Sequence, residues 1–210
     1  MRALIAVLAI AVLAGCAGNL NYVRPAPQGK IEISKTIAEP RGVVWDSAVL
    51  ELGKQFLVID HLDRESGFIN LSYSGNPERF VDCGWITSRL MNSREERIYA
   101  FPGARAHQIY EIMEGDNLFI IERTMSLKGS VRLIFEELGP NSTKVTAKAY
   151  YMVRREVAGR CEGEDISQSS TDDISFTSGG GATLPSNIEG RSIECVGTGK
   201  MERDILSLIE

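Results

Sequence analysis

The sequence contains few of the residues that usually build metal and catalytic centres. Only two histidines, His61 and His107, occur among its 210 residues. The four cysteines have none of the close spacing of a zinc knuckle, and none lies next to a histidine in the sequence. We therefore expect no metal site and no other cofactor, and we expect that the protein is not an enzyme.

The sequence also lacks an excess of basic residues and an apolar run long enough to span a membrane. The chain has 23 Lys and Arg against 28 Asp and Glu, a formal net charge of -5. A nucleic-acid binder needs a basic face, so we expect no nucleic-acid partner. Hydrophobic residues make up 43% of the chain and charged residues 24%, which is an ordinary globular balance. These values exclude a disordered chain and a multi-span membrane protein.

The N-terminus has the pattern of an export signal. Arg2 is followed by an unbroken apolar run, Ala3–Ala14, and then by Gly15 and Cys16. This run is shorter than the roughly 20 residues of a membrane-spanning helix, and it suits the core of a secretory signal. Small residues at the two positions before Cys16 fit the narrow site of a signal peptidase.

The segment Leu13-Ala14-Gly15-Cys16 resembles the lipobox of bacterial lipoproteins. The resemblance implies that a diacylglycerol is attached to the Cys16 thiol and that a signal peptidase cuts between Gly15 and Cys16. It also implies a second acylation, on the new amino group, and two or three acyl chains make a stable anchor. By analogy with the enterobacterial sorting rule, Ala17 favours transfer to the outer membrane, on its periplasmic face.

The chain divides into three parts on this interpretation. Residues 1–15 are the signal peptide. Residues 16–29 are the lipidated N-terminus and a tether, because Asn, Pro and Gly in this segment disfavour a continuous helix or strand. Residues 30–210 form a single α+β periplasmic domain, with a length that suits one core.

Three cysteines remain in an oxidising compartment if Cys16 is lipidated. Cys83 and Cys195 lie in apolar contexts, whereas Cys161 lies between glycines and charged residues, a pattern that predicts an exposed loop. We favour a Cys83–Cys195 disulfide, with Cys161–Cys195 as the second choice.

Period-two and period-four patterns predict the elements of the domain. The expected strands are 30–37, 56–59, 67–73, 117–125, 131–136 and 143–153, with a short possible strand at 174–177. The expected helices are 41–56 and 198–209. Residues 74–105 are interpreted as a long, partly ordered excursion, and most of residues 154–192 as flexible loops, because Gly, Ser and Asp are frequent there.

This order predicts an α+β fold in which an antiparallel sheet packs on helices, with long loops and a terminal helix. The stretch Val43–Tyr73, a helix followed by a hairpin, resembles the helix-grip domains of the C component of the outer-membrane β-barrel assembly machine. The resemblance implies a curved sheet that wraps a helix. It assigns no functional residue.

Few side chains suggest chemistry. His61 with Asp60 or Asp63 is the one candidate for a general base or a ligand, but it lies in an expected hairpin turn. His107 is expected at the surface. The segment Gly197–Lys200 lacks the first glycine and the final Ser or Thr of a phosphate-binding loop. The aromatic residues that could line a ligand cavity, or simply fill the core, are Trp45, Phe56, Phe68 and Phe119.

Three functions fit these observations, in decreasing order of preference. The first is an outer-membrane-anchored, non-catalytic accessory protein or scaffold that binds other cell-envelope proteins. The second is a periplasmic lipoprotein that binds a lipid or a small ligand. The third is an envelope hydrolase that uses His61.

Overall fold

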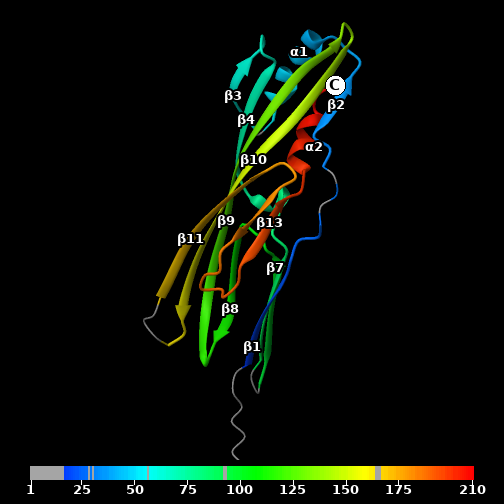
Figure 1. Cartoon of the computed structure of the whole chain (residues 1–210). Coiled ribbons are helices and arrows are strands. Elements are labelled where there is room, and N and C mark those ends of the chain that lie inside the picture. The colour runs from blue at the N-terminus through cyan, green and yellow to red at the C-terminus, as the bar shows by residue number, and fades with distance from the viewer. Residues whose placement is uncertain (1–16, 28, 30, 56, 92–93, 164–166) are drawn as a thin grey trace, which may run out of the picture.

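The structure is a computed structural model that describes residues 17–27, 29, 31–55, 57–91, 94–163 and 167–210 (Figure 1). The helices are α1 (Arg41–Leu52), the short 3-10 helix η1 (Pro77–Arg79) and α2 (Lys200–Ser207). The strands are β1 (Ala17–Val23), β2 (Ser34–Ile37), β3 (Val58–Asp63), β4 (Phe68–Gly75), β5 (Val81–Asp82), β6 (Trp85–Met91), β7 (Glu96–Pro102), β8 (His107–Glu114), β9 (Asn117–Gly139), β10 (Ser142–Cys161), β11 (Ser167–Thr177), β12 (Gly181–Leu184) and β13 (Ile193–Gly197).

A long antiparallel hairpin, β9–β10, runs through the whole molecule (Figure 1). β9 has 23 residues, which corresponds to about 75 Å at the usual rise of a strand. Odd-numbered residues of both strands face the core, and even-numbered residues face solvent along most of the length. The hairpin therefore has one continuous inner face that other elements must cover.

Different strands extend the hairpin at its two ends, and together they form one sheet. Near the β9–β10 turn, β4 pairs with β9 and β3 with β4, while β2 pairs with β10. Toward the other end, β8 pairs with β9 and β11 with β10. All of these pairings are antiparallel.

Two smaller antiparallel sheets complete the fold. Sheet A has the order β1-β6-β7, and sheet C has the order β12-β13-β5. Sheet A packs on β8, where the Phe101 and Tyr110 rings lie 4.9 Å apart. Sheet C packs on β10 and β11, where Gly197 lies against Tyr151 and Phe176. We call this end, with two layers of strands, the strand-covered half.

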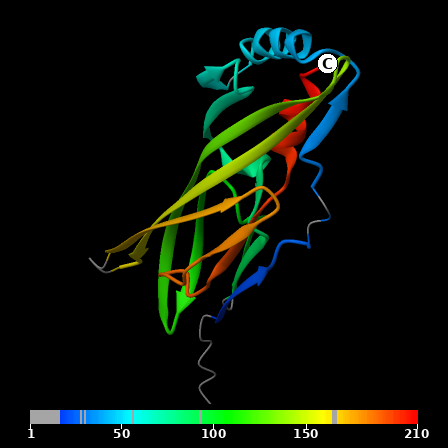
Figure 2. The ribbon, with the colours of Figure 1, turned by 45° about the horizontal axis from the view of Figure 1, so that its top comes forward.

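The two helices cover the inner face at the opposite end, which we call the helix-covered half (Figure 2). α1 buries Val44, Ala48 and Leu52, which are spaced by four residues, together with Trp45. Trp45 packs edge-on against Phe135 of β9, with 5.1 Å between ring centroids. α2 buries Met201, Ile205 and Leu206 and packs against β10.

The fold class is confirmed at the coarse level, since a mainly antiparallel β structure is combined with two α-helices. Both predicted helices and the hairpin of β3 and β4 are present. The predicted strands 117–125 and 131–136 are one strand, because β9 continues through Gly129 and Ser130 without a turn.

Three regions of the sequence prediction were wrong. Residues 17–23, interpreted as tether, form β1, in which Leu20 and Tyr22 point inward and Asn19 and Asn21 outward. Residues 74–105 contain η1, β5, β6 and β7 rather than a loosely ordered excursion. Residues 167–177 form β11, of which only 174–177 was expected as a possible strand, because polar side chains suit a strand with one face in solvent.

Candidate functional site

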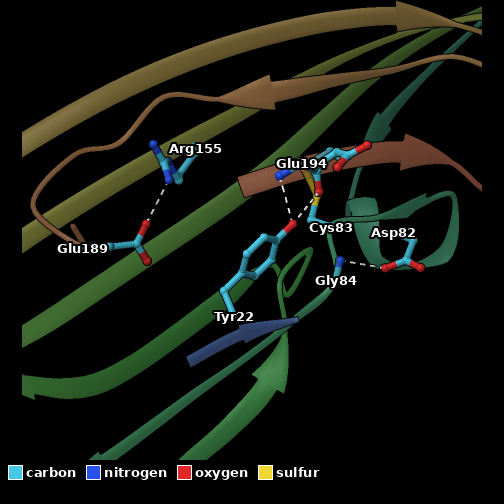
Figure 3. The surroundings of a disulfide bond; sticks show 8 residues. Tyr22, Asp82, Cys83, Gly84, Arg155, Glu189 and Glu194 are labelled. Carbon is cyan, nitrogen blue, oxygen red and sulfur yellow. Dashed lines mark hydrogen bonds and ion pairs between the residues drawn. A yellow bond between two sulfur atoms is a disulfide. The ribbon is translucent and has the colours of Figure 1, made fainter. Parts of the chain in front are cut away.

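A disulfide between Cys83 and Cys195 joins the chain after β5 to β13, as the sequence analysis favoured (Figure 3). Both cysteines are fully buried. Gly84 follows with a φ of 74°, and a Cβ atom there would lie 2.1 Å from the Val23 carbonyl oxygen. Only glycine fits, so the turn that carries Cys83 packs closely on the end of β1.

β1 is fastened to the body at several points along its length. Seven residues pair with β6, Ala17 with Met91 through Val23 with Trp85. The Tyr22 hydroxyl donates to the Glu194 carbonyl oxygen at 3.1 Å and accepts from the Glu194 N–H at 2.9 Å (Figure 3). Burial is the main cause that raises the pKa of Tyr22. The first strand is thus an integral part of the fold.

The strand-covered half encloses a group of charged side chains between its layers. Arg123 of β9 and Arg155 of β10 point inward from the long hairpin, and both are fully buried. Glu189 belongs to the loop 185–192 between β12 and β13, and it is the buried residue of an otherwise largely exposed loop. We call these three residues, with Asp172 of β11 and Tyr110 of β8, the buried ion cluster.

The Glu189 carboxylate lies at the centre of this cluster. Arg155 Nη1 donates to Glu189 Oε2 at 3.0 Å, and the Tyr110 hydroxyl donates to Oε1. Arg123 Nε lies 3.3 Å from Oε1, close enough for an ion pair but without hydrogen-bond geometry. Two hydrogen-bond donors and one further guanidinium, from three neighbouring strands, therefore converge on one carboxylate.

Arg155 has further partners that hold it in place. Its Nη2 donates to Asp172 Oδ2 at 2.7 Å and to the Pro185 carbonyl oxygen at 2.6 Å. Arg123, in contrast, has no hydrogen-bond partner for Nη1 or Nη2 among the described residues. Burial lowers the pKa of the Arg123 guanidinium, and Glu189 opposes that shift. Two guanidiniums and two carboxylates balance the formal charge of the cluster.

Arg155 and Tyr110 thus bind a carboxylate that belongs to the chain itself, that of Glu189. Asn187 adds to this by accepting from the Glu189 N–H at 2.9 Å and donating to Ser170 Oγ at 3.0 Å. The cluster therefore fastens the loop 185–192 across the inner face of β9 and β10. Tyr110 is also buried beside Glu189, and burial raises its pKa above the ordinary value, so it acts here as a neutral donor.

No protein-family model, curated protein or solved structure matches this chain significantly.

The residues predicted from the sequence lie at several separate places. Gly15 and Cys16 lie outside the described residues. Cys161 was expected in an exposed loop, but it ends β10 with its side chain buried on the inner face, as its odd position in that strand requires. The disulfide partners are the predicted pair, so the alternative Cys161–Cys195 disulfide was wrong.

His61 is exposed on β3, which extends through residues predicted as a turn. Asp60 accepts a hydrogen bond from Ser72 Oγ at 3.0 Å, and Asp63 accepts one from the Ser66 N–H at 3.1 Å. His107 is also exposed, and its Nε2 lies 3.0 Å from Glu122 Oε1 on the adjacent strand.

The aromatic residues do not line a common space. Trp45 packs against Phe135, and Phe119 lies 16 residues away on the same strand, about 50 Å at the rise of a strand. Phe68 is partly exposed. Phe56 lies outside the described residues. Trp45 and Phe119 belong to the packed core at opposite ends of the hairpin.

Within the described ranges, no group of three or more His, Cys, Asp or Glu side chains is arranged to hold a metal ion. The helices in the same ranges include none long and apolar enough to cross a membrane.

Sequence reasoning missed the buried ion cluster, although part of it has a signal. Arg155 lies between Val153 and Val157 in a strand that alternates, so its period-two position faces the core. Glu189 gives no such signal, because it lies in an irregular loop and its partners are far away in the sequence.

Proposed function

We propose that this protein is a lipoprotein anchored in the outer membrane through Cys16, where it serves as a non-catalytic accessory protein or scaffold in a cell-envelope protein assembly. The observation that carries the proposal is the lipobox, Leu13-Ala14-Gly15-Cys16, behind a short apolar signal core. Ala17, the residue after Cys16, belongs to β1.

The disulfide supports export of the domain. Structural disulfides form in oxidising compartments such as the periplasm and are rare in the bacterial cytosol. Cys83 and Cys195 are 112 residues apart in the sequence, so their bond closes most of the domain into one loop. A domain with such a bond suits a location on the periplasmic side of the membrane.

The accessory role is supported by the shape and the interior. The fold is an elongated frame around one long hairpin, and elongated frames offer large surfaces to partners (Figure 1). The charges of the two buried arginines are balanced by the protein's own carboxylates, Glu189 and Asp172, which suits a structural role. The helix-covered half, with α1 and the β3–β4 hairpin, is the part to which we assign the proposed helix-grip likeness; superposing an experimental structure on that family would check it.

The anchor is tested by expressing the full-length chain in a Gram-negative host and measuring the mass of its N-terminal peptide. We expect a peptide that starts at Cys16 and carries acyl chains, and we expect the protein to fractionate with the outer membrane. Cys16→Ser should give an unprocessed, unacylated chain. Ala17→Asp is the matched control, since it should keep the acylation but shift the protein toward the inner membrane. An unmodified Cys16 in the wild type would refute the anchor.

The accessory role is tested by purifying the acylated protein in mild detergent at native abundance and identifying the co-purifying proteins. We expect a stoichiometric set of envelope proteins. A protein that elutes alone would contradict the scaffold role while leaving the anchor intact, and a tightly bound lipid would favour the ligand-binding alternative.

A further inference from the structure

The outer face of sheet A carries four exposed apolar side chains. Strand alternation turns Tyr22, Ile86 and Phe101 inward, and it leaves Val23, Trp85, Met91 and Ile98 on the opposite face. Their exposed fractions are 56%, 46%, 55% and 50%. We call these four residues the sheet A apolar face.

Few charges interrupt this face. The remaining outward positions between its two ends include Asn19, Asn21, Thr87 and Ala100, which are uncharged. Arg89 and Glu96 are charged, but they form an ion pair with Nε and Oε1 3.2 Å apart. The face therefore combines exposed apolar side chains with no net charge from this pair.

The predicted anchor is adjacent in the sequence to the first described residue of this sheet. Ala17 pairs with Met91, and Cys16 is the next residue. One residue spans at most about 3.6 Å, so acyl chains on Cys16 must enter the bilayer close to Met91. β1 cannot act as a spacer, because Arg191 Nη2 donates to the Leu20 carbonyl oxygen at 2.6 Å and Gly18 packs against Met113.

Two orientations are compatible with such a short connection. If the end of the molecule faced the membrane, the β8–β9 turn with exposed Glu114 and Asp116 would approach the lipid phosphates. Carboxylates are repelled by an anionic lipid surface. If the outer face of sheet A lay on the membrane, Met91, Ile98 and Trp85 would be covered, which favours this second orientation.

We infer that the sheet A apolar face lies against the lipid bilayer that holds the Cys16 anchor, with Trp85 at the level of the headgroups, where tryptophan is enriched. The inference rests on the proposed function, because it requires the acylated Cys16. It makes sheet A the membrane-facing surface of the domain and leaves the outer, charged face of the long hairpin to the periplasm.

Trp85 is itself a probe for this orientation. The chain has two tryptophans, and Trp45 is 5% exposed while Trp85 is 46% exposed. The acylated full-length protein is reconstituted into vesicles of phosphatidylethanolamine and phosphatidylglycerol that contain lipids with a doxyl quencher near the headgroup. We expect strong quenching of one component of the fluorescence and loss of that component in Trp85→Phe, whose substitution lies at the surface.

Two matched variants test whether the contact with lipid is specific to the sheet A apolar face. Ile98→Asp should reduce the quenching of Trp85, whereas Ile109→Asp, on the outer side of β8 and 51% exposed, should leave it unchanged. Equal quenching of both tryptophans, or none, would overturn the inference. Shielding of Trp85 in native envelopes but not in pure lipid vesicles would also overturn it and would indicate a protein on this face.

The mass of the N-terminal peptide keeps the two proposals distinguishable. If Cys16 is not acylated, the proposed anchor fails. If Cys16 is acylated and Trp85 is not quenched, the anchor stands and the orientation alone is wrong.

Discussion

The two halves of the β9–β10 hairpin bury different side chains on the same face. In the helix-covered half, most inward positions of the hairpin are apolar, and Leu133 and Phe135 meet α1 and the residues around it. In the strand-covered half, the inward positions include Arg123 and Arg155, and the loop 185–192 meets them with Glu189. In the strand-covered half, each strand of the hairpin therefore adds one buried arginine to an otherwise largely apolar inner face.

The difference reflects the elements that cover each half. A helix presents a row of apolar side chains at regular spacing, so burial of this apolar surface is enough to hold it on the sheet. The irregular loop 185–192 brings few large apolar groups, and its position depends on directed contacts from Glu189 and Asn187. We expect the helix-covered half to respond to changes of volume and the strand-covered half to changes of charge.

Tyr151 lies at the boundary between the helix-covered half and the strand-covered half. Its hydroxyl donates to Glu202 of α2 at 2.7 Å, and its ring stacks on Phe176 of β11 at 5.2 Å. Burial raises the pKa of Tyr151 above the ordinary value, so the hydroxyl remains a donor at any physiological pH. This residue couples the terminal helix to the strand-covered half.

The largest effect is expected from removal of the disulfide. Cys83 and Cys195 are separated by 112 residues, and closing a loop of that size restricts the unfolded chain by about 4–5 kcal/mol in the chain-entropy model. The double variant Cys83→Ser, Cys195→Ser should lose most of that free energy of unfolding, measured by urea denaturation. Cys161→Ser is the control for loss of a thiol outside this disulfide. A variant as stable as the wild type would show that the bond does not restrain the domain.

Glu189→Gln should have the next largest effect, and it tests the charged interior directly. The variant keeps the size of the side chain but leaves Arg123 and Arg155 buried without the carboxylate that both approach. Breaking a buried pair by removing one partner costs about 3–5 kcal/mol. Urea denaturation at neutral pH measures the loss.

The control for Glu189→Gln is Asp173→Asn on the outer side of β11. Asp173 pairs with Arg154 at 2.9 Å, and both side chains are about half exposed. Loss of an exposed pair should cost less than about 1 kcal/mol. Similar losses in the two variants would remove the distinction between the charged interior and the charged surface.

Trp45→Ala tests the apolar half. Truncating a buried aromatic residue costs about 3–5 kcal/mol, and we place this one at about 3 kcal/mol because α1 lies on the outside of the fold and can settle on the sheet. Relative to the wild type, the variant should show a larger acceleration of amide hydrogen exchange in α1 than in β9 and β11. Uniform acceleration in both halves would mean that they unfold as one unit and would weaken the comparison.

The same difference explains what the sequence could predict. Repeated apolar spacing in residues 44–52 and 201–209 predicted both helices. A helix that packs through an apolar face shows that face as regular spacing of apolar residues in its own sequence. The disulfide was predictable from the apolar contexts of Cys83 and Cys195. β1 was missed because Leu20 and Tyr22 are the only large apolar residues that mark its inner face. The first part of β11 was missed because residues 167–173 are all polar.

The buried ion cluster was hidden for a different reason. Its five residues come from four strands and a loop, and the strand pairings that bring them together are long-range. A charged residue at an inward strand position, such as Arg155, signals that a partner must exist, but nothing local in the sequence says that the partner is Glu189.

The smallest effect is expected at α2, where an exposed ion network should make the helix-covered half slightly sensitive to acid. Asp204 accepts from Arg79 Nη2 at 2.6 Å and from Lys200 Nζ at 2.7 Å. Burial acts to raise the pKa of Asp204, but the hydrogen bonds from Lys200 and Arg79 outweigh it and hold the pKa below 3.8. A lowered pKa means that the network stabilises the fold above the pKa of the unfolded chain and loses this effect as the pH falls through the folded value. Asp204→Asn should therefore cost less than about 1 kcal/mol at pH 7, and the difference from the wild type should begin to shrink as the pH falls below about 3.8.

The matching variant for this network is Asp46→Asn on α1. Asp46 and Arg64 form an ion pair at 2.9 Å in which both side chains are more than 60% exposed. The lost pair should cost less free energy of unfolding than Asp204→Asn, because solvent screens it more and it has one cationic partner where Asp204 has two. Urea denaturation of the wild type and both variants between pH 3 and pH 7 measures the two differences. If Asp204→Asn keeps a constant deficit across this range, the lost stability comes from packing of α2 rather than from charge, and the helix-covered half has no acid-sensitive contact at this position.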